Sequence, residues 1–353
     1  MRILHVLHSH GYGGAESHVI ILMRGQIAQG HEVMFAGPLD SWLGKACQEH
    51  GIPATHLRMT GLYDIGSHLR LLRLVKTWGA DIIHGHLVRA SYYAGWAGRL
   101  SGTVAISTAH TTNALKHMDR CDHIIADSKA NETNLLAYGH PQDKLSVIYT
   151  GVPDAPRHDC QAIRQELGIP EDTFAVVHAG RFIRDKGQDV LVRALAEVSD
   201  PKVRLYLIGA DDTDYAAQVH QLPQTPGRVT YLGFRSDVQR ILQGFDLYVQ
   251  PSRREGLPLA VSEAFVARLP VIATRVGGMP EVVLHEQTGL VVTPDTPTEM
   301  GQAITRLAAD RAFARQLAEN GRRFYDQHLT EHTMVNRALD VYRGHLSALA
   351  LAH

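Results

Sequence analysis

The chain carries short apolar stretches separated by longer segments in which apolar and polar positions alternate with helical spacing. In the first half, seven stretches are typical of buried strands: residues 3–7, 32–36, 54–57, 81–84, 105–108, 123–126 and 145–148. Between them, residues 16–29, 67–78 and 90–100 show the spacing of helices with one apolar face. This alternation predicts right-handed strand–helix–strand units around a parallel sheet.

A segment rich in Pro and Gly, residues 149–159, interrupts the pattern, which then starts again. Predicted strands follow at 175–179, 204–208, 229–232, 247–250, 271–273 and 290–292, with helices at 189–198, 238–242, 262–267 and 280–284. Residues from about 330 to the end are helical in pattern. We therefore predict an α/β protein of two Rossmann-like, doubly wound domains facing a cleft, with the boundary after residue 153.

Composition narrows the function classes. The 353 residues suit two domains, and 44% hydrophobic with 20% charged residues is the balance of a folded chain. A formal charge of −1 gives no bulk signal for nucleic acid. Cys47, Cys121 and Cys160 lie far apart without metal-ligand spacing, so we expect neither disulfides nor structural zinc, and a cytoplasmic location. No apolar run is long enough to span a membrane, and the first residues are typical of a strand rather than a signal segment.

The segment QPSRREGLPLAVSE, residues 250–263, carries the strongest candidate chemistry. A predicted strand ends in a loop with Glu255, and a helix then carries Glu263. A carboxylate can accept hydrogen bonds from two neighbouring hydroxyls of a sugar or ribose. The backbone of 256–259 enters a helix N-terminus, where free N–H groups favour phosphate. The alternative is a capping carboxylate beside an exposed loop.

Residues 176–187, VVHAGRFIRDKG, place Arg181 and Lys186 just after a strand, between Gly180 and Gly187. Both cations suit the oxygens of a diphosphate and can stabilise charge on a departing one. Two solvated loop cations are the alternative.

The segment GYGGAE, residues 11–16, follows the first strand with glycines that expose backbone amides to an anion, unless it is only a tight turn. We expect most of the 22 histidines to be scattered. His84 and His86 share a strand face, but no nearby carboxylate or cysteine completes a metal site, so no metal is expected. His110 is a candidate for a polar contact to a sugar, or else a structural histidine.

Residues 67–78, SHLRLLRLVKTW, interleave Arg70, Arg73 and Lys76 with leucines. Such a helix can rest on an anionic membrane surface, or it can pack its leucines on the sheet and leave its cations in water.

The run LGFRSDVQRIL…FDLYVQPSRREGLPLAVSEAFVARLPVIATRVGGMPEVV…TGLVV resembles the family-4 retaining glycosyltransferases of GT-B architecture, and the resemblance covers nearly the whole chain. It implies the following roles. Glu255 contacts hydroxyls of the donor sugar, and Glu263 contacts those of the ribose. Arg181 and Lys186 hold the diphosphate, together with the backbone at Gly256, Leu257, Pro258 and Leu259. Gly13 and Gly14 lie near the phosphate and the acceptor, His110 lies beside the sugar, and Arg235 lies near the base.

The resemblance also implies that the terminal helix returns to the first domain. The expected division is then 1–153 plus about 333–353 for the acceptor side and 154–332 for the donor side. Acceptor contacts are expected around residues 39–45, 60–68 and 87–93. The chain departs from the family pattern at Thr150, where relatives often have Asn, and at Arg268, where a glycine is common.

The implied activity is transfer of a hexosyl or N-acetylhexosaminyl group from a nucleotide-diphosphate donor, a UDP-sugar in preference to GDP-mannose, to an acceptor hydroxyl. The implied route retains anomeric configuration, with the leaving diphosphate deprotonating the acceptor, and needs no metal or other cofactor. Relatives commonly build bacterial lipopolysaccharide, capsule or exopolysaccharide on lipid-linked acceptors, so peripheral contact with the inner face of the membrane is expected. Competing hypotheses are a sugar-nucleotide epimerase, a phosphorylase, for which the chain is short, and an inactive nucleotide-sugar binder.

Overall fold

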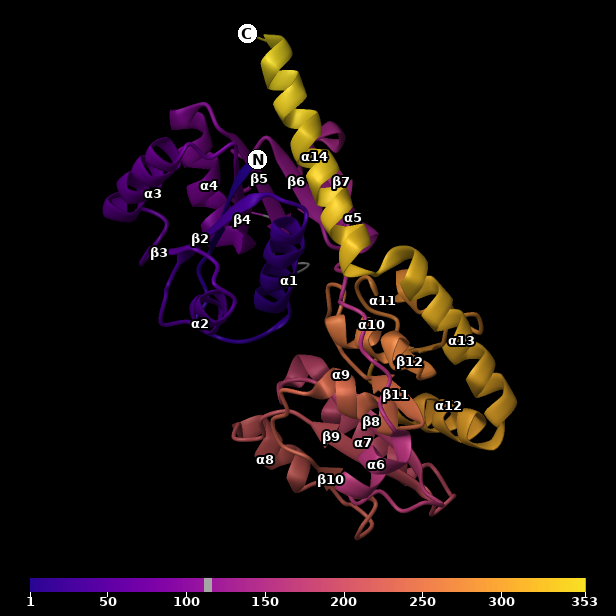
Figure 1. The fold of residues 1–353 in the computed structure, drawn as a ribbon. Helices are drawn as coiled ribbons and strands as arrows, with labels where there is room; N and C mark the ends of the chain where they lie inside the picture. Colours follow the sequence, from indigo (N-terminus) through magenta and orange to yellow (C-terminus); the bar gives the residue numbers. More distant parts are fainter. Residues whose placement is uncertain (111–115, 353) are drawn as a thin grey trace. The chain divides into compact units, whose positions relative to one another are not determined.

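The computed structural model describes residues 1–110 and 116–352, and the chain divides into two compact units (Figure 1). Unit 1 comprises Met1–Pro153 and Leu329–His353, and unit 2 comprises Asp154–His328. The sequence-based division placed the first boundary at the same residue and the second near residue 333, a few residues later than the structure has it. The assignment of an acceptor side and a donor side to these units stays a prediction.

Unit 1 is built on a seven-stranded parallel sheet in the order β3-β2-β1-β4-β5-β6-β7. The strands are β1 (Arg2–Leu7), β2 (Glu32–Gly37), β3 (Ala54–His56), β4 (Ile82–His86), β5 (Val104–Ala109), β6 (His123–Ala126) and β7 (Leu145–Val147). The helices are α1 (Gly14–Ala28), α2 (Trp42–Glu49), α3 (Ile65–Trp78), α4 (Leu87–Ser101), α5 (Lys129–Tyr138) and α14 (Glu331–Ala352), with a 3-10 turn at Gln142–Lys144.

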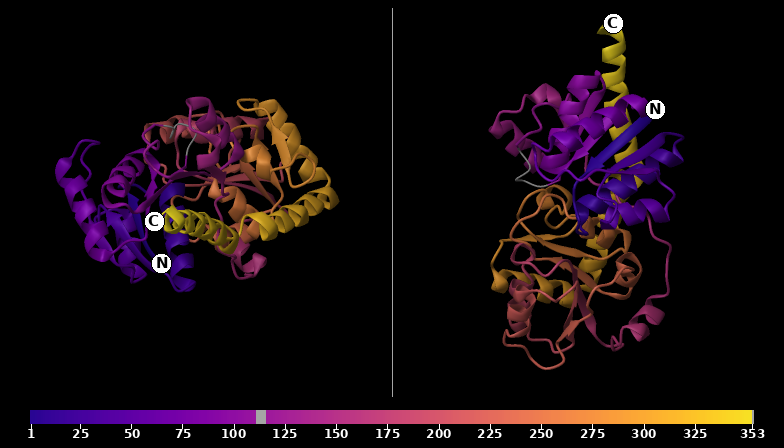
Figure 2. Two further views of the ribbon diagram at one scale, coloured as in Figure 1. Left: turned by 90° about the horizontal axis from the view of Figure 1, so that it is seen from above. Right: turned by 90° about the vertical axis from the view of Figure 1, so that its left-hand side faces the viewer.

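Helices cover both faces of the unit 1 sheet, which explains why its strands are apolar at successive positions. On β1, Ile3 and Leu7 belong to a core shared with α1, α2 and α14. Leu4 and Val6 point the other way, into a core shared with α3 and α4. The last helix, α14, lies along the same face as α1 (Figures 1 and 2).

Unit 2 is built on a six-stranded parallel sheet in the order β10-β9-β8-β11-β12-β13. The strands are β8 (Phe174–Ala179), β9 (Val203–Ile208), β10 (Val229–Tyr231), β11 (Leu247–Gln250), β12 (Val271–Thr274) and β13 (Leu290–Val292). The helices are α6 (Cys160–Glu166), α7 (Gln188–Ala196), α8 (Asp214–His220), α9 (Val238–Ile241), α10 (Leu259–Val266), α11 (Met279–Val282), α12 (Pro297–Ala309) and α13 (Arg311–His328), with 3-10 turns at Arg184–Lys186 and Leu242–Gly244.

Each sheet reverses its strand order at one point, and ligands of such sheets bind outside the carboxyl ends of the strands there. In unit 1 the reversal lies between β1 and β4, and in unit 2 it lies between β8 and β11. The loops that follow these four strands are therefore the first places to look for a site.

The predicted fold class, parallel-sheet α/β in both halves, is confirmed, and every predicted strand is present within one or two residues at its ends. Helices α2, α5, α6, α8, α12 and α13 had not been predicted. Arg268, where the family pattern favours glycine, has a φ of 59° just after α10, the left-handed conformation that glycine adopts most easily. Within the described residues, no helix combines the length and apolar character needed to cross a bilayer.

Candidate functional site

Glu255, in the loop after β11, is the centre of a dense polar cluster in unit 2. Its Oε1 atom accepts hydrogen bonds from Lys186 Nζ at 2.5 Å, Ser252 Oγ at 2.7 Å and Gln250 Nε2 at 3.0 Å. The Glu255 side chain is only 9% exposed. Among the described residues none donates to Oε2, so this oxygen can accept from a ligand hydroxyl.

The loops after β8 and β11 are held against each other around this cluster. Gly187 has a φ of 72°, and a Cβ there would lie 2.1 Å from the carbonyl oxygen of Pro251, so only glycine fits this approach. Arg253 forms a two-pronged ion pair with Asp189 at 2.8 and 2.9 Å. Lys186 therefore reaches Glu255 from a loop whose position is fixed by backbone contact and by a charge pair.

Arg181 is the second predicted phosphate ligand, and it differs from Lys186 in having no partner. Its side chain is exposed, and no described residue forms a hydrogen bond or ion pair with its guanidinium. Its backbone carbonyl accepts from Gln188 Nε2 at 2.9 Å, which fixes the loop on which it stands. The guanidinium is thus a cation near the point where the strand order of unit 2 reverses, and it is available to an anionic ligand.

Helix α10 begins directly after Pro258, and no side chain caps its N-terminus. Val261 N donates to Pro258 O at 3.2 Å, whereas no described residue accepts from the N–H groups of Leu259 and Ala260, which are therefore available to an anion. The preceding loop is pinned, because Gly278 N donates to Gly256 O at 2.8 Å and a Cβ on Gly277 would collide with the carbonyl of Glu255. The predicted backbone donors lie in this stretch, at Gly256, Leu257 and Leu259, since Pro258 has no N–H to donate.

Glu263 lies on α10, as predicted from the sequence. Removal of its carboxyl from water raises the pKa from 4.5 to about 7, while a hydrogen bond with Gln239 opposes the shift. The residue still keeps part of its surface exposed. A partly accessible carboxyl with its pKa near neutrality is well suited to meet hydroxyl groups of a ligand.

Arg235, predicted near the base, takes part in a cluster of charges on the surface of unit 2. Its guanidinium donates to Asp237 at 2.9 Å and to Glu166 at 3.0 Å, and Arg240 binds the same two carboxylates. The role predicted for Arg235 stays a prediction.

Gly13 and Gly14 lie at the reversal point of unit 1, Gly13 just before α1 and Gly14 as its first residue. Gly13 precedes the first residue of α1, its backbone is extended, and no side chain caps the helix. The amides at this helix start are thus open to a ligand in the same way as those of α10.

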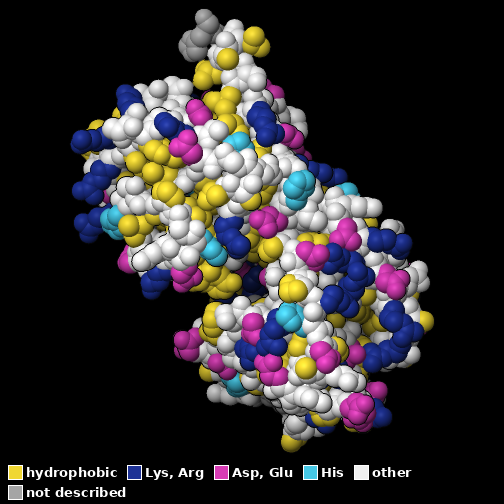
Figure 3. Space-filling view, in the orientation of Figure 1, with side chains coloured by type: hydrophobic (Ala, Val, Ile, Leu, Met, Phe, Trp, Pro, Cys, Tyr) yellow, Lys and Arg dark blue, Asp and Glu magenta, His cyan; other side chains and the backbone are white. Residues whose placement is uncertain are grey.

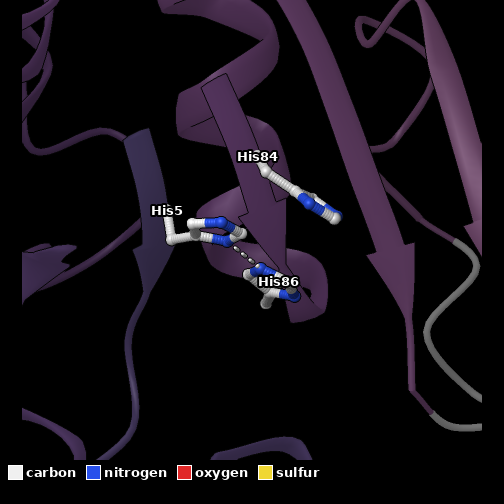
Figure 4. Close-up of side chains that lie close together, drawn as sticks. All are labelled: His5, His84 and His86. Atoms are coloured by element: carbon white, nitrogen blue, oxygen red, sulfur yellow. Dashed lines mark hydrogen bonds between the residues drawn. The ribbon is translucent and has the colours of Figure 1, made fainter. Parts of the chain in front are cut away.

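His110 follows β5 and lies half-buried beside a cluster of buried histidines that the sequence had not indicated. Its Nε2 lies 3.1 Å from His86 Nδ1, and His86 Nε2 lies 2.9 Å from His5 Nδ1 (Figure 4). His18 packs its ring at 4.6 Å from that of His110. Five of the 22 histidines, His5, His18, His84, His86 and His110, are thus gathered together, because β1, β4 and α1 each turn histidines toward the same face of the sheet.

Two groups of three histidines bring nitrogen atoms within 4.8 Å of one another: His5, His84 and His86, and His18, His86 and His110. In the first group, the rings of His84 and His86 are stacked at 4.1 Å with 28° between their planes. Imidazoles coordinate metals in the ring plane at about 2 Å, so rings stacked in this way cannot both point at one ion. The short nitrogen–nitrogen distances are those of shared hydrogens.

Two family models match the chain: "Glycosyltransferase Family 4" over residues 12–155 and "Glycosyl transferases group 1" over residues 159–324. A D-inositol 3-phosphate glycosyltransferase of Corynebacterium diphtheriae is 29% identical over 277 residues, 67% of this chain and 64% of the relative. An N-acetyl-alpha-D-glucosaminyl L-malate synthase of Bacillus anthracis is 26% identical over 62% of this chain and 58% of the relative. The matches thus span less than two thirds of these relatives.

Solved structures show the same fold over almost the full length. Anabaena Alr3699/HepE in complex with UDP superposes with a TM-score of 0.88, at 23% identity, over 98% of this chain and 100% of the other. The lipopolysaccharide outer core galactosyltransferase WaaB superposes with a TM-score of 0.73, at 17% identity, over 98% and 100%. These structures show that the chain has the GT-B fold, and the two family models, which together span most of it, identify it as a member of the family-4 glycosyltransferases.

Proposed function

We propose that the protein is a retaining glycosyltransferase that moves a hexosyl or N-acetylhexosaminyl group from a nucleotide-diphosphate donor to an acceptor hydroxyl. The observation that carries the proposal is the free Oε2 of Glu255, which lies in one cluster with Lys186 and close in sequence to the uncapped start of α10. A sugar linked to a diphosphate needs an oxygen that accepts hydrogen bonds from the sugar hydroxyls, and a cation and free amides that bind the diphosphate.

The diphosphate is the leaving group, and unit 2 supplies positive charge for it. The ammonium group of Lys186 donates one hydrogen bond to Glu255 and keeps its other hydrogens for a ligand. The guanidinium of Arg181 is unpaired within the described residues. The first amides of α10 add the positive end of a helix dipole. Such fixed donors stabilise charge that develops as the sugar–phosphate bond breaks. Because Arg, Lys and amides can do this, the proposed reaction needs no metal.

Retention of anomeric configuration follows if the leaving diphosphate deprotonates the acceptor hydroxyl on the same face of the sugar. The test is transfer in the presence of EDTA, followed by NMR of the new linkage. We expect transfer at an unchanged rate and a product with the donor's anomeric configuration. An inverted product contradicts the mechanism, and loss of activity that Mg²⁺ restores contradicts metal independence. Binding of nucleotide sugars without transfer to any acceptor would favour an inactive binder.

We propose a UDP-sugar as donor and a lipid-linked or glycan acceptor in the assembly of lipopolysaccharide, capsule or exopolysaccharide. Support for the donor comes from Anabaena Alr3699/HepE, whose structures contain UDP and UDP-glucose. Support for the acceptor class comes from the fold shared with WaaB, a lipopolysaccharide outer core galactosyltransferase. Tests with UDP-glucose, UDP-N-acetylglucosamine, UDP-galactose and GDP-mannose in parallel identify the donor.

Helix α3 is the surface proposed to contact the inner face of the cytoplasmic membrane. It packs Ser67, Leu71 and Val75 on the sheet and leaves Ile65 71% and Leu69 61% exposed. Its cations Arg70, Arg73 and Lys76 are exposed too, and Lys and Arg side chains gather over this part of unit 1 (Figure 3). Apolar anchors beside cations are what an anionic bilayer binds.

Co-sedimentation with vesicles tests this surface. We expect binding to phosphatidylglycerol vesicles, weaker binding to phosphatidylcholine, and loss of binding in the double variant Leu69→Ser with Arg73→Glu. The control Arg99→Glu changes an exposed arginine on α4 and is expected to bind as the wild type does. Equal binding of wild type and double variant contradicts the assignment.

A further inference from the structure

We propose that Gln26 acts on His110 through two intervening histidines and fixes the tautomer in which His110 Nδ1 carries a lone pair. His110 then offers a hydrogen-bond acceptor, rather than an N–H donor, to a hydroxyl of the bound sugar. This last step rests on the proposed function. The tautomer itself is a property of unit 1 and can be measured without any substrate.

The chain of hydrogen bonds begins at the amide of Gln26 on α1, which is fully buried. Its oxygen, Oε1, lies 2.8 Å from His5 Nε2. An amide oxygen only accepts, so the hydrogen of His5 is on Nε2. A neutral imidazole has one N–H, and His5 Nδ1 must therefore accept the hydrogen of His86 Nε2, at 2.9 Å.

Because each neutral imidazole has only one N–H, the direction of the hydrogen bonds is also fixed at His110. Since His86 has its hydrogen on Nε2, its Nδ1 is an acceptor and takes the hydrogen of His110 Nε2, at 3.1 Å. His110 Nδ1 is left with a lone pair, and no described residue donates to it. The rule holds because the three rings are neutral: burial lowers the pKa of His5 to about 4, that of His110 to about 3, and that of His86 well below 6.5.

A second branch of hydrogen bonds starts at the amide nitrogen of Gln26. Gln26 Nε2 donates to the hydroxyl of Tyr342 on α14 at 3.3 Å. The hydroxyl gives its own hydrogen to His84 Nδ1 at 2.6 Å, and His84 Nε2 donates to Thr108 Oγ1 at 2.7 Å. Turning the amide over would reverse every hydrogen in both branches at once. The buried network thus has two complete arrangements, and the position of the Gln26 amide selects one of them.

This places Gln26 as a positioning residue for His110, although they come from different elements and do not touch. Gln26 lies on α1 and contacts His5 on β1, His86 is the last residue of β4, and His110 follows β5. The hydrogen position on His110, which is predicted to contact the sugar, is thereby set by Gln26, a residue of a helix that packs on the sheet.

Imidazole nitrogen shifts test the tautomer directly, because a nitrogen with a lone pair resonates far from one with a hydrogen. In protein labelled with ¹⁵N-histidine, we expect His110, assigned from the His110→Gln variant, to show N–H at Nε2 and a lone pair at Nδ1. Gln26→Met removes the amide at similar volume, and we expect both His110 nitrogens to move toward each other as two tautomers mix. Should this variant not fold, Tyr342→Phe frees the amide to turn and is expected to give the same change.

The control is Ser146→Ala, which removes the hydroxyl 2.9 Å from His123 Nε2 in the same sheet but outside the cluster. We expect only the His123 signals to change. A hydrogen on His110 Nδ1 in the wild type, or unchanged His110 shifts in a folded Gln26→Met protein, overturns the proposal.

Turnover shows whether Gln26 acts through His110. We expect Gln26→Met to lower kcat by about threefold to tenfold, which corresponds to the free energy of one hydrogen bond between His110 and the sugar. In the His110→Asn background, the same substitution is expected to change kcat no further, because the group it positions is gone. Additive losses overturn the positioning role. Absence of transfer activity in the wild type would refute the proposed function while leaving the NMR result on the tautomer standing.

Discussion

Glu255→Ala is expected to lower kcat by about two to three orders of magnitude while changing the affinity for the nucleotide only a few-fold. The wild-type carboxylate accepts three hydrogen bonds on Oε1, one of them from Lys186, and has Oε2 free for the sugar. The alanine variant loses the sugar contact and leaves Lys186 without its partner, so both the sugar and the phosphate ligand are misplaced. Steady-state rates and calorimetric titration with the nucleotide measure the two effects separately.

Glu263→Ala serves as the comparison, because the proposal assigns it to the ribose rather than to the sugar. We expect it to weaken nucleotide binding by about tenfold, with a smaller effect on kcat. Glu299→Ala removes a carboxylate on α12 that accepts from Thr293 N, and is expected to behave as wild type. Unperturbed kinetics in both the Glu255 and the Glu263 variants would remove the proposed site.

Acidification is expected to unfold unit 1 before unit 2. The histidines responsible are His5, His18, His84, His86 and His110, whose pKa values burial lowers below 6.5. Above pH 6.5 the rings are neutral in both the folded and the unfolded chain, so they add no pH dependence. Below 6.5 the unfolded chain takes up protons that the folded chain refuses, and stability falls until pH reaches the lowered values. Each such ring removes about 1.4 kcal/mol per pH unit in this range.

Unit 2 has less of this acid sensitivity. It buries His178, whose pKa desolvation lowers to about 4. It also contains Glu263, whose raised pKa of about 7 acts in the opposite sense, since the folded state binds that proton more readily and gains stability as pH falls through 7. Amide exchange or residue-resolved NMR between pH 7 and pH 4.5 separates the two units. Equal loss in both units, or constant stability of unit 1 down to pH 4.5, contradicts the expectation.

Sequence patterns located the strands well because strands covered on both faces are continuously apolar. The helices that were not predicted have no comparably strong apolar pattern. Helix α13, for example, buries only Ala314, Leu317, Ala318, Gly321 and Tyr325 among its 18 residues. The segments 176–187 and 250–263 were identified because they follow strands with charged residues and glycines. The contact between Lys186 and Glu255 was not, because the two residues are 69 positions apart and meet only through the neighbouring positions of β8 and β11.

The histidine network was out of reach of sequence reasoning for the same reason. His5 and His84 are register partners on β1 and β4, and nothing in the spacing of the chain says that these two strands are adjacent. The alternation of Ile3, His5 and Leu7 on one face was visible in the sequence, and it places a histidine at a core position. The contact between His5 and His86 can be predicted only when the order of the strands in the sheet is known.

Melting temperature with a panel of nucleotide sugars, in the presence of EDTA, tests most directly whether this chain binds a sugar donor in unit 2. A ligand that binds only the folded state raises the melting temperature by an amount that grows with the logarithm of its concentration relative to its Kd. We predict that at least one UDP- or GDP-sugar stabilises the wild type in EDTA and stabilises Glu263→Ala markedly less. A folded wild-type protein that none of these compounds stabilises, or an equal shift in the variant, would contradict the account.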